Sequence, residues 1–331
     1  MCHIDIHTHI MPPSIPKWVD KFGYEGFVHL IPQTNCQADM MIGDKFFRKV
    51  DQNSWDPNTR KKEMIETGIS KQVLSTVPVL FNYWAKGEHC LQTSMFYNDH
   101  IAEVCLKHPE NYYGIGTLPM QDPDLACREL ERCMKVLGMK GIEIGTHIND
   151  WNLNDKVLWP VYAKAEELGA CIFVHPWDMM GEKNMSRYWL PWLVGMPAES
   201  SLAICSLIFG GVFENFPNLR FAFAHGAGSF PFTIGRIKHG FDVRPDLVAI
   251  DNDISPEKYL GKFWIDSLVH DIHALEYNLR LFGEDKIAFG SDYPFPLGDL
   301  TGGKFINESG LSEVTKKKIM STNALSWLGC N

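Results

Sequence analysis

Short apolar runs typical of buried β-strands recur along this chain, and helix-like stretches stand between them. The helix-like stretches at 57–68, 124–138 and 155–169 each end in glycine, as a helix C-terminus prefers. Eight strands are predicted, at 2–7, 70–77, 112–118, 140–146, 170–176, 219–226, 262–269 and 285–292. Strands that alternate with helices in this way favour a parallel sheet.

Eight strand–helix units in 331 residues indicate an α/β fold of the (β/α)₈ TIM-barrel type, which needs only about 250 residues. Insertions must therefore account for the rest. Residues from about 14 to 50 contain no good helix, but "GFVHLI" and "ADMMIGDKFFRKV" indicate short strands, the second with a Gly-Asp turn. We expect a small β-rich flap there, a second long loop at 177–200, and a single barrel domain over 1–331.

Histidine and aspartate gather at the ends of the predicted strands. The first strand ends in His7 and His9, the fifth in His175, the sixth in His225 and the eighth in Asp292. A barrel of this type builds its active site at the C-terminal ends of its strands. Because residues i and i+2 of a strand face the same side, the first two histidines could hold one metal ion from one wall. We expect His175 and Asp292 to complete the ligand set.

Three imidazoles and one carboxylate favour a divalent transition metal, with zinc as the first choice. His225 is then the best candidate for the general base that exchanges protons with a metal-activated water, and Asp292 could bind the metal, orient the water, or both. His3 stands near the start of its strand and is interpreted as structural, while His147 stays open as a substitute. No lysine ends the fourth strand, and Glu143 alone is a thin basis for a second metal.

Composition narrows the class of function. The net charge is −9 and no dense Lys/Arg cluster occurs, which argues against nucleic acid as a partner. The longest apolar run, 202–213, is shorter than the roughly 20 residues of a membrane span, so we expect a buried helix and no membrane. Nine cysteines without CxxC spacing, and no visible targeting segment, predict reduced thiols and a cytoplasmic location.

Longer stretches resemble the amidohydrolase superfamily over essentially the whole chain, and its metal-dependent decarboxylases in particular. They include "IDIHTH", "FVHPWDMM", "YWLPWLVGMPAE", "FAHGAGSFPFTIGR" and "GSDYPFPLG". The resemblance is strongest to members that act on 2-amino-3-carboxymuconate 6-semialdehyde in the kynurenine pathway of tryptophan degradation. It implies no organic cofactor and one zinc ion per subunit, with His225 handling the water and four ligands: His7, His9, His175 and Asp292.

The same resemblance implies a substrate site shared within a homodimer. Arg48, on the flap, would bind a substrate carboxylate, and Arg236 would reach the site from the neighbouring subunit. Trp192, Phe295 and Met179 would line the pocket. Arginine suits a dicarboxylate because its planar guanidinium forms bidentate hydrogen bonds.

Two positions depart from the pattern of these relatives. They often carry a lysine several residues ahead of the flap arginine, whereas Ile42 stands here and Lys45 is the only nearby lysine before Arg48, so no lysine is assigned. "HGAG" stands where relatives often read HGGG. Ala227 should matter little unless that backbone needs a positive φ.

The expected reaction is a non-oxidative decarboxylation that yields 2-aminomuconate 6-semialdehyde and CO₂. Addition of a metal-activated water before CO₂ leaves, and direct protonation of the carbon, both remain open. The alternative function is a metal-dependent hydrolase, a lactonase or amidase, of a related dicarboxylate, because the fold alone cannot separate the two. A non-catalytic, metal-stabilised barrel is disfavoured, since a structural zinc site would lack the spare His225.

Overall fold

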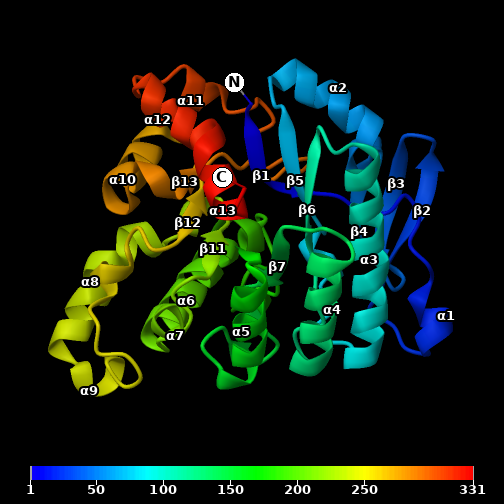
Figure 1. The fold of residues 1–331 in the computed structure, drawn as a ribbon. Coiled ribbons are helices and arrows are strands. Elements are labelled where there is room, and N and C mark those ends of the chain that lie inside the picture. Colours follow the sequence, from blue (N-terminus) through cyan, green and yellow to red (C-terminus); the bar gives the residue numbers. More distant parts are fainter. Residues whose placement is uncertain (1, 331) are drawn as a thin grey trace.

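The computed structural model describes residues 2–330 and has a parallel eight-stranded sheet wrapped by helices (Figure 1). Each strand pairs with the next barrel strand along the chain, and the N–H of Ile6 donates to the carbonyl oxygen of Phe289 at 2.9 Å, so the sheet curves back on itself. The predicted (β/α)₈ barrel is confirmed. In order, its strands are β1 (Ile4–His9), β5 (Lys71–Ser75), β6 (Tyr112–Gly116), β7 (Gly141–Gly145), β10 (Cys171–His175), β11 (Arg220–Phe223), β12 (Trp264–Asp266) and β13 (Ile287–Ala288).

Helices cover the outer face of the sheet (Figure 1). Several start at an aspartate whose side chain accepts first-turn N–H groups, as Asp56 does from Thr59, and α2 and α5 end at the left-handed Gly68 and Gly169. The helices around the barrel are α2 (Pro57–Thr67), α3 (Gly87–Lys107), α4 (Pro123–Lys135), α5 (Trp159–Leu168), α6 (Met196–Phe209), α7 (Val212–Asn215), α8 (Phe230–Val243), α9 (Pro245–Val248), α10 (Ile272–Phe282), α11 (Lys304–Asn307), α12 (Glu313–Lys317) and α13 (Asn323–Leu328).

The insertion after β1 forms the predicted β-rich flap. Its antiparallel sheet has the order β2-β3-β4, and Gly43 takes a φ of 55° in the predicted Gly-Asp turn. The expectation that 14–50 holds no helix is wrong, because a short helix, α1 (Trp18–Phe22), forms there. Trp18 is buried and stacks on Phe22 with ring centroids 5.3 Å apart, so aromatic packing rather than periodicity favours this helix. The flap strands are β2 (Val28–Thr34), β3 (Gln37–Ile42) and β4 (Lys45–Asp51).

The segment at 177–200, expected to be a loop, is helical at its end. A π-helical turn at Pro191–Gly195 runs directly into α6. By length and composition, Pro191–Phe209 is apolar enough to cross a membrane, but 44% of its most apolar window is buried in the protein. A core helix passes the same test, so this segment is weak evidence for a membrane span. A two-residue hairpin, β8 (His147–Ile148) and β9 (Trp151–Asn152), follows β7.

The interior of the barrel is apolar at its N-terminal end. Side chains from the strands pack there against Trp327 of α13, whose ring lies 5.9 Å from that of Phe173. The indole N–H of Trp327 donates to the carbonyl oxygen of Arg220 at 3.0 Å, which anchors this plug. The opposite end of the interior is left for polar groups.

A β-bulge in β1 places its polar and apolar side chains together inside the barrel. Asp5 pairs with Gln72 and Thr8 with Leu74, so β1 has one residue more than β5 between these pairs. Simple alternation would place Ile6 and His7 on opposite faces. With the bulge, Ile6 joins the inner apolar cluster and His7 still faces the interior, where its ring contacts Phe173.

Candidate metal centre and substrate pocket

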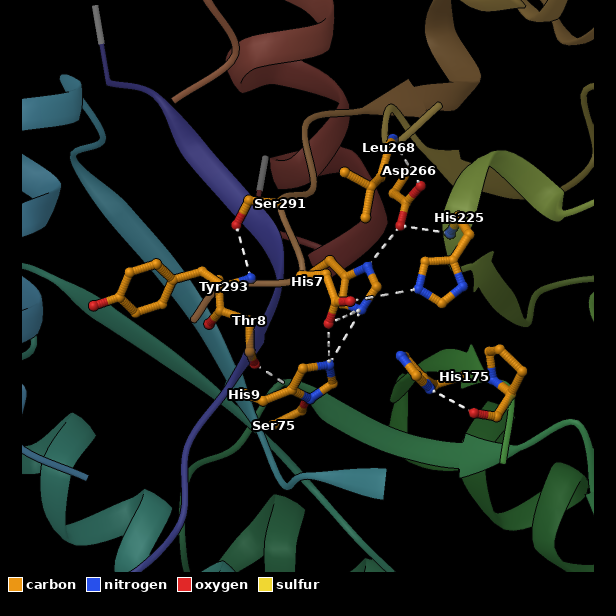
Figure 2. Close-up of polar contacts among 12 residues, drawn as sticks. His7, Thr8, His9, Ser75, His175, His225, Asp266, Leu268, Ser291 and Tyr293 are labelled. Atoms are coloured by element: carbon orange, nitrogen blue, oxygen red, sulfur yellow. Dashed lines mark hydrogen bonds and ion pairs between the residues drawn. The ribbon is translucent and has the colours of Figure 1, made fainter. Parts of the chain in front are cut away.

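Four histidines from three strand ends converge at the C-terminal mouth of the barrel (Figure 2), and Asp292, from a fourth strand end, lies among them. The Nε2 atoms of His7 and His9 are 3.2 Å apart, and Oδ1 of Asp292 lies 3.5 and 3.1 Å from them. One ligand atom each from His7, His175, His225 and Asp292 lie within 4.8 Å of one another. The structure therefore brings together all five residues that the sequence selected.

Hydrogen bonds set the tautomers of the three expected histidine ligands. In His7, His9 and His175, Nδ1 faces an oxygen acceptor and so carries the N–H. A neutral imidazole has one N–H, which leaves a lone pair on each Nε2, directed into the site. The acceptors, at 2.7, 2.8 and 2.9 Å, are Oδ2 of Asp266, the carbonyl oxygen of Thr76 and the carbonyl oxygen of Pro176.

These lone pairs need a cation. Two acceptor nitrogens at 3.2 Å cannot hydrogen-bond to one another, and Nε2 of His175 is buried without a hydrogen-bond partner among residues 2–330. Imidazole nitrogens with a carboxylate oxygen are the ligands that zinc and similar divalent metals accept. The donor set fits one such ion.

Electrostatics keep the expected ligands in their metal-binding forms. Burial lowers the pKa of His9 and lowers that of His175 further, so both imidazoles stay neutral. Burial alone would raise the pKa of the Asp292 carboxyl, but His225 and His9 outweigh it and hold the pKa well below its usual range. Burial opposes the charge on His225, yet the adjacent Asp292 carboxylate raises its pKa above the ordinary value.

A pocket of about 210 Å³ opens beside this centre, and it contains Arg48. The guanidinium carbon lies 4.7 Å from the ring centroids of Phe47 and Phe295 and 5.8 Å from that of Trp192. Within residues 2–330, no carboxylate forms an ion pair with it. An unpaired guanidinium among aromatic rings is a good site for a substrate carboxylate.

Comparisons with known proteins agree with this geometry. The amidohydrolase family matches residues 4–330. The chain belongs to that family. It is 53% identical over 327 residues to the 2-amino-3-carboxymuconate-6-semialdehyde decarboxylase of Dictyostelium discoideum (98% of this chain, 91% of the relative), and 37% identical over 376 residues to the enzyme of that name from Caenorhabditis elegans (98% and 94%).

A solved structure shows the same fold in a decarboxylase. The 5-carboxyvanillate decarboxylase of Novosphingobium aromaticivorans, complexed with manganese, superposes with a TM-score of 0.80 at 21% identity, covering 99% of this chain and 96% of that one. The resemblance predicted from the sequence is confirmed, and this amidohydrolase is a decarboxylase.

Two predicted substrate residues lie outside the pocket of this amidohydrolase chain. Met179 does not line it but is buried against Gly195, where an added Cβ would come within 2.8 Å of the Met179 Cβ. Arg236 is exposed on α8. Trp192 and Phe295, in contrast, line the pocket as expected.

His3 and His147, the other two histidines considered from the sequence, lie apart from the expected site. His3 lies one residue before β1, at the far end of that strand from the metal centre. The ring nitrogens of His147 face the carbonyl oxygens of Asn149 and Asp178, at 2.8 and 2.9 Å, so neither nitrogen is directed at the expected metal site.

The sequence does not single out two polar residues of this site, Asp266 and Lys49, and it offers Glu143 only as a weak candidate ligand for a second metal. Asp266 ends β12 and binds His7, and the strand-end rule that selected the ligands would also have selected it. Lys49 lines the pocket directly after Arg48, whereas only positions before that arginine were considered for a lysine. Glu143 is fully buried, and neither of its oxygens has a hydrogen-bond partner among residues 2–330. Its Oε1 lies 3.7 Å from Nδ1 of His9, and burial raises the pKa of the carboxyl well above the usual range.

Several backbone positions at this mouth are left-handed. His225, Ala227 and Asp292 have φ values of 56°, 67° and 57°. Such values are rare for residues other than glycine and persist only where surrounding contacts enforce them. The condition under which Ala227 would matter is therefore met.

Proposed function

We propose that this enzyme converts 2-amino-3-carboxymuconate 6-semialdehyde to 2-aminomuconate 6-semialdehyde and CO₂, with one zinc ion per subunit and no organic cofactor. The observation that carries the proposal is the unpaired Arg48 beside three converging imidazole lone pairs, which fits an acid held next to a metal. The choice of substrate is supported by the 53% identity to the 2-amino-3-carboxymuconate-6-semialdehyde decarboxylase of Dictyostelium discoideum, and the kynurenine pathway follows from that substrate.

Different side chains would bind the metal ion and orient the substrate. His7, His9, His175 and Asp292 would hold the ion, which supplies Lewis acidity and an activated water when bound. Arg48 would orient a carboxylate of the substrate, while the aromatic rings around it exclude water.

His225 would move the proton. Its Nε2 lies 3.8 Å from Oδ2 of Asp292, and its Nδ1 is buried without a hydrogen-bond partner among the described residues. It could take a proton from water before addition, or deliver one to the carbon that loses CO₂. The same position serves both routes.

We also propose a homodimer in which Arg236 completes the neighbouring site. The exposed face of α8 carries this arginine one turn after Phe232, which is 70% exposed and shares a pocket wall with Leu193, itself 50% exposed. Large apolar side chains exposed together mark protein–protein contacts in many proteins. A two-fold axis through this face would bring one subunit's Arg236 toward the other's pocket.

The cytoplasm is the proposed location. All nine cysteines are free, which suits a compartment that keeps thiols reduced.

The test of the reaction follows the loss of the semialdehyde's near-ultraviolet absorbance together with CO₂ release by the zinc-loaded enzyme. Arg48→Ala should raise KM and lower kcat/KM by about 100-fold or more, because a charge-assisted bidentate contact is lost. Arg48→Lys should recover only part of this, since lysine cannot bind a carboxylate bidentately. Hydrolysis of a lactone without CO₂ release would instead identify a hydrolase.

The test of the dimer mixes two inactive variants, Arg48→Ala and Arg236→Ala. If the site is shared, a mixed dimer has one site with both arginines, and random exchange should restore about a quarter of wild-type activity. No recovery after proven subunit exchange would refute the shared site.

A further inference from the structure

Asp266 contacts both the metal-binding side and the proton-transfer side of the site. It ends β12 and is completely buried. Its Oδ2 accepts hydrogen bonds from Nδ1 of His7 at 2.7 Å and from the backbone N–H of His225 at 2.9 Å (Figure 2). Its Oδ1 accepts from the backbone N–H groups of Gly226 at 2.7 Å and Leu268 at 3.0 Å. One carboxylate thus meets four donors.

The contact with His7 controls which nitrogen can bind a metal. An acceptor at Nδ1 fixes the proton there and leaves the lone pair on Nε2, which lies 3.2 Å from Nε2 of His9. Carboxylates that hold a ligand histidine in this way typically change metal affinity by about 10- to 100-fold.

The hydrogen bonds that Asp266 accepts from His225 and Gly226 stabilise a strained turn after β11. His225 and Gly226 donate their N–H groups to Asp266 while both hold left-handed φ values, 56° and 58°. An added Cβ at Gly226 would lie 2.3 Å from a methyl of Val269, so the turn is also packed closely. These two hydrogen bonds favour the backbone conformation from which the His225 ring reaches the site.

We propose that Asp266 is a positioning residue that couples the ring of the metal ligand His7 to the backbone of the proton carrier His225. Both of its oxygens accept from the four donors above, so its role would be to set the tautomer of one histidine and the direction of the other. The proposal rests on the proposed function only for the proton-transfer role of His225. Losing this carboxylate should therefore disturb metal binding and turnover separately.

Asp266→Asn tests the coupling, because an amide has one acceptor oxygen and presents an N–H₂ group to two of the four donors. Metal-free protein is titrated with Zn²⁺ against a chelator, and we expect about 10- to 100-fold weaker binding. Turnover is then measured at saturating Zn²⁺, where kcat should still be about tenfold lower or more, with KM within twofold because the Arg48 pocket is intact.

Glu129→Gln is the matched control, since Glu129 is 2% exposed, is hydrogen-bonded by Asn98 and Arg132, and lies on α4. It should lower the melting temperature while leaving zinc affinity and kcat within twofold. If Asp266→Asn does not fold, Asp266→Glu replaces it, and the same two losses are expected because the longer side chain displaces the carboxylate.

Each half of the coupling can fail separately. Wild-type zinc affinity in a folded Asp266 variant overturns the link to His7, and wild-type kcat at saturating Zn²⁺ overturns the link to His225. If the wild-type protein does not decarboxylate the substrate, the proposed function fails, but zinc affinity still tests the first link. A crystal structure of the variant tests the second, since φ of His225 should then leave the left-handed region.

Discussion

The two ends of the barrel interior differ in how they treat polar groups. At the N-terminal end, Trp327 packs against Phe173 and its indole N–H is hydrogen-bonded, whereas the indole N–H of Trp264 has no hydrogen-bond partner among residues 2–330. At the C-terminal end, Nε2 of His175 and both oxygens of Glu143 are buried without hydrogen-bond partners among residues 2–330, and Asp292 has a left-handed φ. The same strands contribute to both ends.

This difference separates stability from chemistry along each strand. Unpaired polar groups and left-handed backbone cost folding free energy, so they persist only where the rest of the fold compensates. Trp327 offers that compensation without touching the site itself, because Phe173 lies between its ring and the ring of His7. Conserving the plug should therefore protect the fold, and changing the mouth should alter chemistry at little cost in stability.

The largest effect should follow His175→Ala, which breaks the mouth. Zn²⁺ binding should weaken strongly and turnover should fall by about 10³-fold or more, because the variant loses one of the three imidazoles proposed as ligands. The free energy of unfolding of the metal-free protein should change far less, since Nε2 has no hydrogen-bond partner among residues 2–330 and the variant loses only the hydrogen bond from Nδ1 to the Pro176 carbonyl oxygen. Metal titration, kcat and urea denaturation check this, and a variant that keeps wild-type turnover would contradict the metal centre.

Trp327→Ala breaks the other end. The indole is completely buried, so its removal should lower the free energy of unfolding by about 3–5 kcal/mol. Zn²⁺ affinity and kcat, measured well below the melting temperature, should stay within about twofold of wild type, because α13 lies at the far end of the barrel. Equal losses of stability and zinc affinity would show that the two ends are not independent.

Much of this arrangement could be predicted because it repeats a simple rule. Strand ends carry the chemistry of a parallel barrel, and that rule found His7, His9, His175, His225 and Asp292 and would also have found Asp266. The bulge in β1 was not predictable, since the alternation of Ile4, Ile6, His7 and His9 does not mark the extra residue. Arg236 shows another limit, as the role proposed for it depends on a second subunit.

A half-buried imidazole outside the mouth sharpens the comparison. His100, on α3, also has a buried Nε2 without a hydrogen-bond partner in the described chain, and burial lowers its pKa from 6.5 to about 4. Between pH about 4 and 6.5, the imidazole therefore binds a proton in the unfolded chain but not in the folded chain. Stability from this group is present above about pH 6.5 and is lost as the pH falls to about 4, by at most about 3 kcal/mol.

His100→Phe should reduce the fall in the free energy of unfolding between pH 6.5 and about 4, because a phenylalanine ring is apolar and cannot titrate. Urea denaturation of metal-free protein between about pH 4 and 7 measures the difference from wild type, so that protonation of the metal ligands cancels. His273→Gln, at a side chain that is 86% exposed, is the control. An unchanged pH slope in His100→Phe would show that burial of this lone imidazole does not limit stability in acid.

The smallest effect should come from Ala227→Gly, which changes the "HGAG" of this chain to the HGGG that relatives often carry. Glycine removes the cost of a left-handed alanine, about 1–2 kcal/mol. It also removes a fully buried methyl worth about 0.8 kcal/mol and adds freedom to the unfolded chain worth about 0.4–1 kcal/mol. The opposing effects should nearly cancel, leaving the free energy of unfolding within about 1 kcal/mol of wild type and kcat within about twofold. A change above about 2 kcal/mol in urea denaturation would show that strain and packing are not balanced here. Burial of the Ala227 methyl in the hydrophobic core would then not be what offsets the strain of its left-handed backbone.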